Sequence, residues 1–227
     1  MAEFAESLDL LWGVQKHDSQ IVREQERIAK ASKAEAHEQA KVDETQATLK
    51  SQQEKLRQLK NEHKELEGEL HRLDERVNQL DAQGTEAGSQ AAAKQRIKID
   101  ELETAGLELL SLISDQESAI ELTRSELATR TNVLEGVAKT TKEVTEAAQA
   151  VIDQHVAERT EAVKLVVPEL LHVYDEVQHR HPGSALCHQS GEFCNACQGE
   201  LRAQTQMQIK ARAEIVRCPH CLRILDV

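Results

Sequence analysis

Apolar residues recur at every seventh position along residues 14–80 of this chain. Sustained over this length, the repeat is typical of a coiled coil, in which each helix offers one narrow apolar seam to another helix. The first row of the seam begins at Val14 and is interrupted at Glu35, whereas the second row becomes regular only from Leu59. The first row is Val14, Ile21, Ile28, Val42, Leu49, Leu56, His63, Leu70 and Val77, and the second is Leu59, Leu66, Leu73 and Leu80.

A second stretch, residues 99–151, repeats this pattern, although Thr123 and Arg130 interrupt one of its rows. Between the two stretches, residues 81–89 hold two glycines flanked by Asp, Thr and Ser, which predicts a helix end, a turn and a new helix start. Because the two arms have nearly equal lengths, we predict an antiparallel hairpin in which residue i faces roughly residue 170 − i. The alternative is one unbroken helix in a parallel dimer. The rows of the second arm are Ile99, Gly106, Ile113, Ile120, Leu127 and Leu134, and Leu102, Leu109, Val137, Val144 and Val151.

Composition limits what else the chain can be. Aromatic residues make up 2% of the sequence and charged residues 30%, so burial must come from a seam between helices and not from a thick core. The net charge of −12 disfavours broad binding to nucleic acid or to an anionic membrane. No apolar run reaches the length of a signal peptide or a membrane span. We therefore expect a cytoplasmic protein with no membrane partner.

Near the carboxyl end, two Cys-x-x-Cys pairs are separated by twenty residues. Each pair can form a tight turn that directs both sulfurs at one point, and four thiolates close a tetrahedral shell around Zn²⁺. Such a site has no position for water, so we predict one structural zinc ion. Redox-active pairs and disulfides are the alternatives, and they require a thioredoxin-like setting and an oxidising compartment respectively. The predicted ligands are Cys194, Cys197, Cys218 and Cys221.

The predicted domain order is a coiled-coil hairpin (1–167), a short connecting helix (168–183) and a zinc ribbon (184–227). Pro168 suits the first position of the connecting helix, whose apolar face would hold Leu170, Leu171, Tyr174 and Val177. Within the ribbon we predict paired strands over residues 204–216, with Ile209, Ile215 and Val216 pointing inward. The fold class is therefore mainly α, with short β-strands in the ribbon.

Several cysteine and histidine residues remain outside this scheme. Cys187 has no Cys-x-x-Cys partner, so we interpret it as a buried or free thiol. Two histidines lie near these cysteines in the sequence and could replace a ligand, although four thiolates already close the shell. Three more could form a second metal site, although a polar face at a domain junction is the simpler explanation. These two groups are His188 and His220, and His172, His179 and His181.

No catalytic pattern is present: the sequence has neither a Gly-rich phosphate loop nor a nucleophile elbow, so we expect no enzymatic activity. A non-enzymatic adaptor that binds protein partners, as a monomer or homodimer, is the first hypothesis. An RNA-binding regulator is the second, although the sequence lacks a basic stripe with aromatics for stacking. Its nucleic-acid contacts would be Arg202, Lys210, Arg212, Arg217 and Arg223.

From Pro168 onward the motifs resemble those of a bacterial family with a coiled-coil hairpin and a C-terminal four-cysteine zinc ribbon. Residues 168–174 match its Pro-x-Leu-Leu-x-x-Tyr helix, residues 194–197 its first cysteine pair, and residues 218–225 its Cys-Pro-x-Cys-Gly-Arg-Ile-Leu ending. The opening helix, Leu10 to Asp18 with Gln15, is also similar. Leu222 stands where the family usually has Gly, and Asp226 where it usually has Tyr.

This family includes a flagellar zinc-ribbon chaperone and a related type III secretion chaperone. The resemblance therefore implies a cytoplasmic adaptor or chaperone in flagellar or secretion assembly, and some members are described as binding messenger RNA or an alternative sigma factor. The family's tip commonly carries an Asn…Glu-Tyr segment just before the second helix, whereas residues 88–94 here read Gly-Ser-Gln-Ala-Ala-Ala-Lys.

Overall fold

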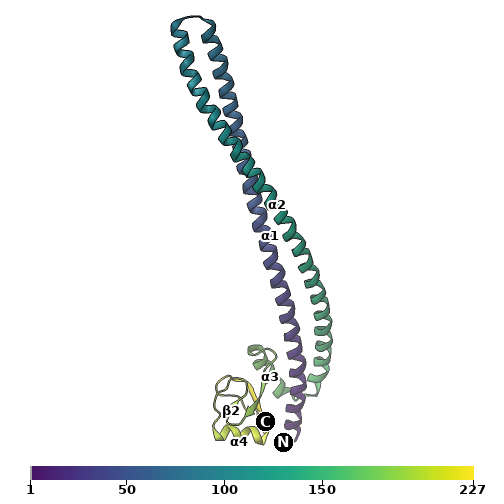
Figure 1. The fold of residues 1–227 in the computed structure, drawn as a ribbon. Coiled ribbons are helices and arrows are strands. Elements are labelled where there is room, and N and C mark those ends of the chain that lie inside the picture. Colours follow the sequence, from purple (N-terminus) through teal and green to yellow (C-terminus); the bar gives the residue numbers. More distant parts are fainter. Residues whose placement is uncertain (1) are drawn as a thin grey trace. The chain divides into compact units, whose positions relative to one another are not determined.

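The computed structural model describes residues 2–227, so Met1, the first residue of the predicted hairpin domain, lies outside the described residues. Two long helices, α1 (Ala2–Ala82) and α2 (Glu86–Ala162), account for most of the chain and run antiparallel (Figure 1). A small three-stranded sheet lies near the carboxyl end. The predicted fold class, a mainly α protein with a helical hairpin and a small ribbon, is confirmed.

The turn between α1 and α2 uses both glycines of the predicted tip. Gly84 has a φ of 64°, a left-handed conformation that costs glycine little and lets α1 end. Thr85 caps α2, because its hydroxyl accepts a hydrogen bond from the backbone N–H of Gly88 at 3.0 Å. A Cβ on Gly88 would lie only 2.9 Å from that hydroxyl oxygen. One glycine therefore ends α1, and the other lets the capping side chain approach closely.

The chain forms two compact units, and both long helices pass through each of them. The first unit comprises Met1–Glu35 and Ala138–Val227, and the second comprises Ala36–Val137.

In the second unit, the predicted seam rows are the residues that α1 and α2 turn toward each other. Val77 and Leu80 of α1 form a buried cluster with Ala92 and Ile99 of α2. Farther along, a Cβ on Gly106 would lie 3.4 Å from Leu66. Cross-helix ion pairs flank the seam: Lys60 with Glu117 and Lys98 with Glu69, both at 2.6 Å. The predicted antiparallel arrangement thus holds in this unit.

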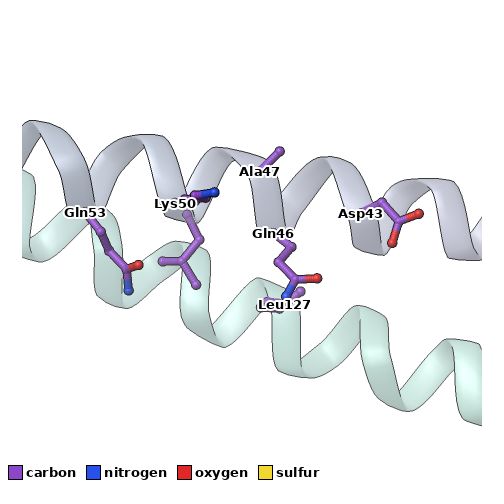
Figure 2. Close-up of a pocket in the computed structure, with 7 residues that line it drawn as sticks. Asp43, Gln46, Ala47, Lys50, Gln53 and Leu127 are labelled. Atoms are coloured by element: carbon purple, nitrogen blue, oxygen red, sulfur yellow. The ribbon is translucent and has the colours of Figure 1, made fainter.

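Where apolar residues thin out, the seam of the second unit leaves a hollow (Figure 2). Successive turns of α1 form nearly all of its wall, and α2 contributes Leu127. The lining residues are Asp43, Gln46, Ala47, Leu49, Lys50, Gln53 and Leu127.

The first unit combines the ends of the two long helices with the remaining elements of the chain. A short 3₁₀ turn, η1 (Val163–Leu165), leads from α2 to α3 (Pro168–Arg180). Three strands follow, β1 (Leu186–Ser190), β2 (Phe193–Cys194) and β3 (Ile224–Asp226), and α4 (Ala203–Ala211) lies between β2 and β3 in sequence. The strand order is β2-β1-β3, with β1 antiparallel to β2 and parallel to β3.

A single apolar core ties the elements of the first unit together. Leu11 and Val14 of α1 are fully buried against Leu170 and Tyr174 of α3 and Ile224 of β3. The predicted apolar face of the connecting helix is confirmed, because three of its four members are buried and Leu171 packs against the same core.

The predicted strands over residues 204–216 are wrong, because residues 203–211 form α4. This segment, Ala-Gln-Thr-Gln-Met-Gln-Ile-Lys-Ala, consists mostly of good helix formers, and a single buried residue, Ile209, anchors it. Arg212 then ends the helix in the left-handed conformation, with a φ of 45°. Ile209 and Val216 are buried as predicted, and Ile215 is half-buried.

Among the helices of residues 2–227, none has the length and apolar character needed to cross a membrane.

Candidate metal centre

The four predicted cysteine ligands lie on two turns of nearly identical backbone geometry. In the first turn, the N–H of Gln198 donates to the carbonyl of Cys194 at 2.8 Å, and in the second the N–H of Leu222 donates to that of Cys218 at 2.9 Å. Gln198 and Leu222 both have positive φ values, of 60° and 64°. Each Cys-x-x-Cys pair is therefore closed by a left-handed residue directly after its second cysteine.

The two turns bring all four sulfurs together. The four Sγ atoms lie within 4.8 Å of one another. Sγ of Cys194 is 3.9 Å from that of Cys221, and Sγ of Cys197 is 3.7 Å from that of Cys218. A tetrahedral zinc ion with Zn–S distances of about 2.3 Å separates its sulfurs by about 3.8 Å. The donor set and its spacing therefore fit one zinc ion with a closed shell. The residue-level assignment of these four ligands stays a prediction.

Close contacts between the two turns fix their relative position. Nε2 of His220, in the second turn, is 3.0 Å from the carbonyl oxygen of Glu200, which follows the first turn. His220 also lies over Gly199, where an added Cβ would come within 2.3 Å of its ring. At the end of α3, Nε2 of His181 is 2.8 Å from the carbonyl oxygen of Cys221. Because Gly199 has no side chain, the ring of His220 can pack against it, and the two turns can face each other.

Burial affects the acidity of these thiols. It raises the pKa of Cys194 and of Cys218 to about 12. At Cys221 burial acts in the same direction, but hydrogen bonds from the backbone and side chain of Arg223 and from neighbouring thiols outweigh it and lower the pKa to about 7. A zinc ion must therefore displace protons from the two buried thiols, which couples zinc binding to pH.

The remaining cysteine and the two adjacent histidines have other roles in the structure. Cys187 in β1 is a buried free thiol, as predicted, with its sulfur 3.5 Å from that of Cys194. Burial raises the pKa of Cys187 to about 11. His188 stacks on Trp12, with ring centroids 4.2 Å apart, and its Nδ1 lies 2.6 Å from the carbonyl of Val227. With the contact of His220 to Glu200, both histidines have partners other than the sulfur cluster.

The alternative second metal site at His172, His179 and His181 does not form. His172 and His179 are exposed, and His181 contacts the second cysteine turn instead. Within residues 2–227, these three side chains do not converge as a group that could hold an ion.

Three of the five basic residues considered for nucleic acid are bound within the protein. Arg212 donates to the carboxylates of Asp9 and Asp226, at 2.6 and 3.0 Å. Arg217 donates to Glu176 at 2.7 Å, and Arg223 to the carbonyl of Ser184 at 2.8 Å. Arg202 and Lys210 are exposed. The five side chains therefore do not form one free basic surface.

Several polar residues that attach the ribbon to α1 were not predicted from the sequence. Nε1 of Trp12 donates to Asp226 of β3 at 2.8 Å. The side-chain amide of Gln15 bonds both the N–H and the carbonyl of Leu186, as a neighbouring strand would. Asp226 stands where the family resembled above usually has Tyr, and this difference could have revealed the contact. A carboxylate in an apolar strand needs buried donors. Asp226 is 3% exposed, and Trp12 and Arg212 supply those donors.

These features define a class: an α-helical hairpin with a four-cysteine zinc ribbon at its carboxyl end. Residues 194–225 match the family model of the C4-type zinc ribbon domain. The match contains all four predicted ligands, and the closely spaced cysteines fit this zinc-binding class. No curated protein sequence matches the chain significantly.

Solved structures share the fold over nearly the whole chain. The CT398 protein from Chlamydia trachomatis matches with a TM-score of 0.85 and 18% identity, over 100% of this chain and 99% of that one. The HP0958 protein from Helicobacter pylori matches with a TM-score of 0.71 and 12% identity, over 98% and 97% of the two chains. A protein from Mycobacterium smegmatis matches with a TM-score of 0.51 and 18% identity, over 97% of each chain. At these identities the likeness concerns the fold alone.

Proposed function

We propose that this chain is a non-enzymatic, zinc-stabilised adaptor that binds protein partners along α2. The observation that carries the proposal is an asymmetry between the two helices of the second unit. Within Ala36–Val137, every large apolar side chain that is strongly exposed belongs to α2, and α1 contributes none of them. These residues, which we call the α2 apolar surface, are Ile97, Leu107, Leu110, Leu112, Leu122 and Val133, and they are 47–74% exposed.

Their positions in the seven-residue repeat show that the seam does not need them. Leu110 and Leu112 flank the seam residues Leu109 and Ile113, whereas Ile97, Leu107 and Leu122 lie on the solvent side of the helix. A coiled coil usually carries charged residues there. Burying one such side chain against a partner contributes about 1.5–3 kcal/mol, which supports a role for these residues in partner binding.

The hollow in the seam supports the non-enzymatic part of the proposal. Its one carboxylate, Asp43, is exposed and accepts a hydrogen bond from Gln39 at 2.8 Å. Besides the ammonium of Lys50, Figure 2 shows amide and aliphatic side chains along the rest of the wall, and no histidine or cysteine lines this hollow. Asp43 and Lys50 are its two titratable side chains, and neither stands beside a nucleophile in the lining, as nucleophilic catalysis requires.

The finer form of the proposal is a bacterial cytoplasmic chaperone or adaptor in flagellar or type III secretion assembly. The resemblance of residues 168–174 and of the cysteine motifs to that family supports it. The internal pairing of Arg212, Arg217 and Arg223 makes RNA the less favoured partner.

The test uses a triple variant, Ile97→Gln, Leu107→Gln and Leu122→Gln. After cross-linking in the native cell, partners recovered with the wild type should be absent with this variant, while helicity by circular dichroism stays unchanged. The matched control places Gln at three exposed α1 positions, Thr48, Ser51 and Lys55, and should retain the partners. Recovery of the same partners with both triples would refute the proposal, as would recovery of RNA that depends on Arg202 and Lys210.

A further inference from the structure

A second group of metal-ligating side chains lies in the first unit, between the start of α1 and the end of α2. His17 belongs to α1, whereas His155 and Glu158 are three residues apart on one face of α2. Nδ1 of His17 is 3.0 Å from Nδ1 of His155, and each of these nitrogens is 3.2 Å from Oε2 of Glu158. Three atoms with ligand chemistry thus form a nearly equilateral triangle.

Hydrogen bonding alone does not satisfy this triangle. Each Nδ1 carries either one proton or one lone pair, and the carboxylate oxygen only accepts. If both nitrogens donate to Glu158, two N–H groups face each other across 3.0 Å. If one nitrogen donates to the other, the accepting nitrogen has no proton to donate to the carboxylate oxygen, and two acceptors then lie 3.2 Å apart. Every arrangement of protons therefore leaves one side of the triangle repulsive, whereas a cation at its centre attracts all three atoms.

The dimensions of the triangle match those of a bound transition metal. Imidazole nitrogens and carboxylate oxygens bind zinc at about 2.0–2.2 Å, so adjacent ligands of a tetrahedral ion lie about 3.4 Å apart, and those of an octahedral ion about 2.9 Å. The observed separations of 3.0–3.2 Å lie between these values. The ligands would need to move by only a few tenths of an ångström.

The surroundings of the triangle hold these ligands in place. Nε2 of Gln154 donates to Oε1 of Glu158 at 2.8 Å, which leaves Oε2 directed at the histidines. Asp18 follows His17 in α1, and Arg159 follows Glu158 in α2. These two residues form an ion pair in which Arg159 donates to Asp18 at 2.7 Å. The histidine side chains are 20% exposed and that of Glu158 is 42% exposed, so an ion could enter from the solvent.

We propose that His17, His155 and Glu158 bind a divalent transition-metal ion of the zinc class, at a site distinct from the cysteine ribbon. Two imidazoles and one carboxylate favour zinc, nickel, cobalt or iron over the all-oxygen shells of magnesium and calcium. Three protein ligands leave at least one position open, so this ion, unlike that of the ribbon, is exchangeable and carries water. The site joins the two helices where the second seam row of α1 is polar.

Metal titration of the full chain tests the proposal. Protein with its ribbon filled is titrated with Zn²⁺ by calorimetry and, separately, with Co²⁺ by absorption spectroscopy. We expect one further equivalent, and its Co²⁺ spectrum should lack the thiolate charge-transfer band of a cysteine site. His17→Ala and His155→Ala should each abolish this equivalent, and Glu158→Gln should weaken it at least tenfold. Gln154→Leu, which removes only the positioning contact, should weaken it about 10–100-fold.

His71→Ala is the matched control, because His71 and Glu75 form an exposed pair 3.4 Å apart on α1 and offer no third ligand. This variant should retain the extra equivalent. Absence of a second equivalent with either metal in excess would overturn the proposal, as would an equivalent that persists in the His17→Ala, His155→Ala double variant. If an alanine variant unfolds, Glu158→Gln decides alone, because its half-exposed side chain adds little to packing.

Discussion

Asp18 is the residue whose removal tests the packing of the first unit most sharply. It is 6% exposed, and it accepts hydrogen bonds from Arg159 of α2 at 2.7 Å and from the hydroxyl of Tyr174 of α3 at 2.8 Å. One carboxylate of α1 therefore holds two other helices. Burial, together with the charge of Asp18, raises the pKa of Tyr174 far above its ordinary value, so the hydroxyl keeps its proton and remains a donor at neutral pH.

The expected cost of Asp18→Ala follows from what the substitution leaves behind. Removing one partner of a buried charge pair costs about 3–5 kcal/mol, because the other charge stays desolvated. Arg159 is 27% exposed at its side chain and keeps a second carboxylate, Asp175, at 2.9 Å. We therefore expect about 3 kcal/mol, at the lower end of that range. Tyr174→Phe removes one hydrogen bond to a charged group and should cost about 1.5–3 kcal/mol.

Urea unfolding followed by Trp12 fluorescence measures these changes, because the single tryptophan of the chain lies in the same unit as Asp18. The Asp18→Ala, Tyr174→Phe double variant should cost clearly less than the sum of the single variants, since both remove the same hydrogen bond. Asp153→Ala, at an exposed position of α2 in the same unit, is the control and should change stability by no more than about 0.5 kcal/mol. A cost below about 1 kcal/mol for Asp18→Ala, as for surface pairs, would refute the reasoning.

Three further predictions concern the ribbon. Gly199→Ala should reduce zinc affinity, measured by chelator competition, because the added Cβ meets the ring of His220 at 2.3 Å; unchanged affinity would show that the two turns tolerate separation. Leu222→Gly should raise the stability of the zinc-bound protein by about 1 kcal/mol in thermal unfolding, since it relieves a left-handed leucine at φ 64°, and a decrease would contradict this. Acid should release the zinc: with the pKa of both Cys194 and Cys218 near 12, at least two protons compete with the ion, so the apparent affinity should fall about 100-fold or more per pH unit below neutrality, and a pH-independent affinity would rule out thiolate ligation.

The sequence predicts most of the hairpin because its periodicity reports burial directly. Each row residue from Leu59 to Leu80 is at least half-buried, and the two tip glycines mark the turn where α1 ends and α2 begins. The cysteine spacing likewise specifies the candidate zinc site, since two tight turns can place four sulfurs together whatever lies between them.

What lies between the cysteines is not predictable in the same way. Residues 203–211 show no clear alternation, and one buried residue, Ile209, decides the placement of α4. The polar contacts between α1 and the ribbon depend on a docking geometry that periodicity does not encode. His17 and His155 could have been paired by extending the antiparallel register to the helix ends, because residue 17 then faces residues near 153. The apolar repeat itself does not point to these histidines, because their rows are polar there.

The central claim is that four cysteine thiolates hold one zinc ion in the ribbon. X-ray absorption at the zinc edge tests it most directly, on His17→Ala protein in which the ribbon is the one remaining proposed site. We expect four sulfur neighbours at about 2.3 Å and no nitrogen or oxygen neighbour in the same shell. A mixed sulfur–nitrogen shell, or a folded ribbon that contains no zinc, would contradict the account.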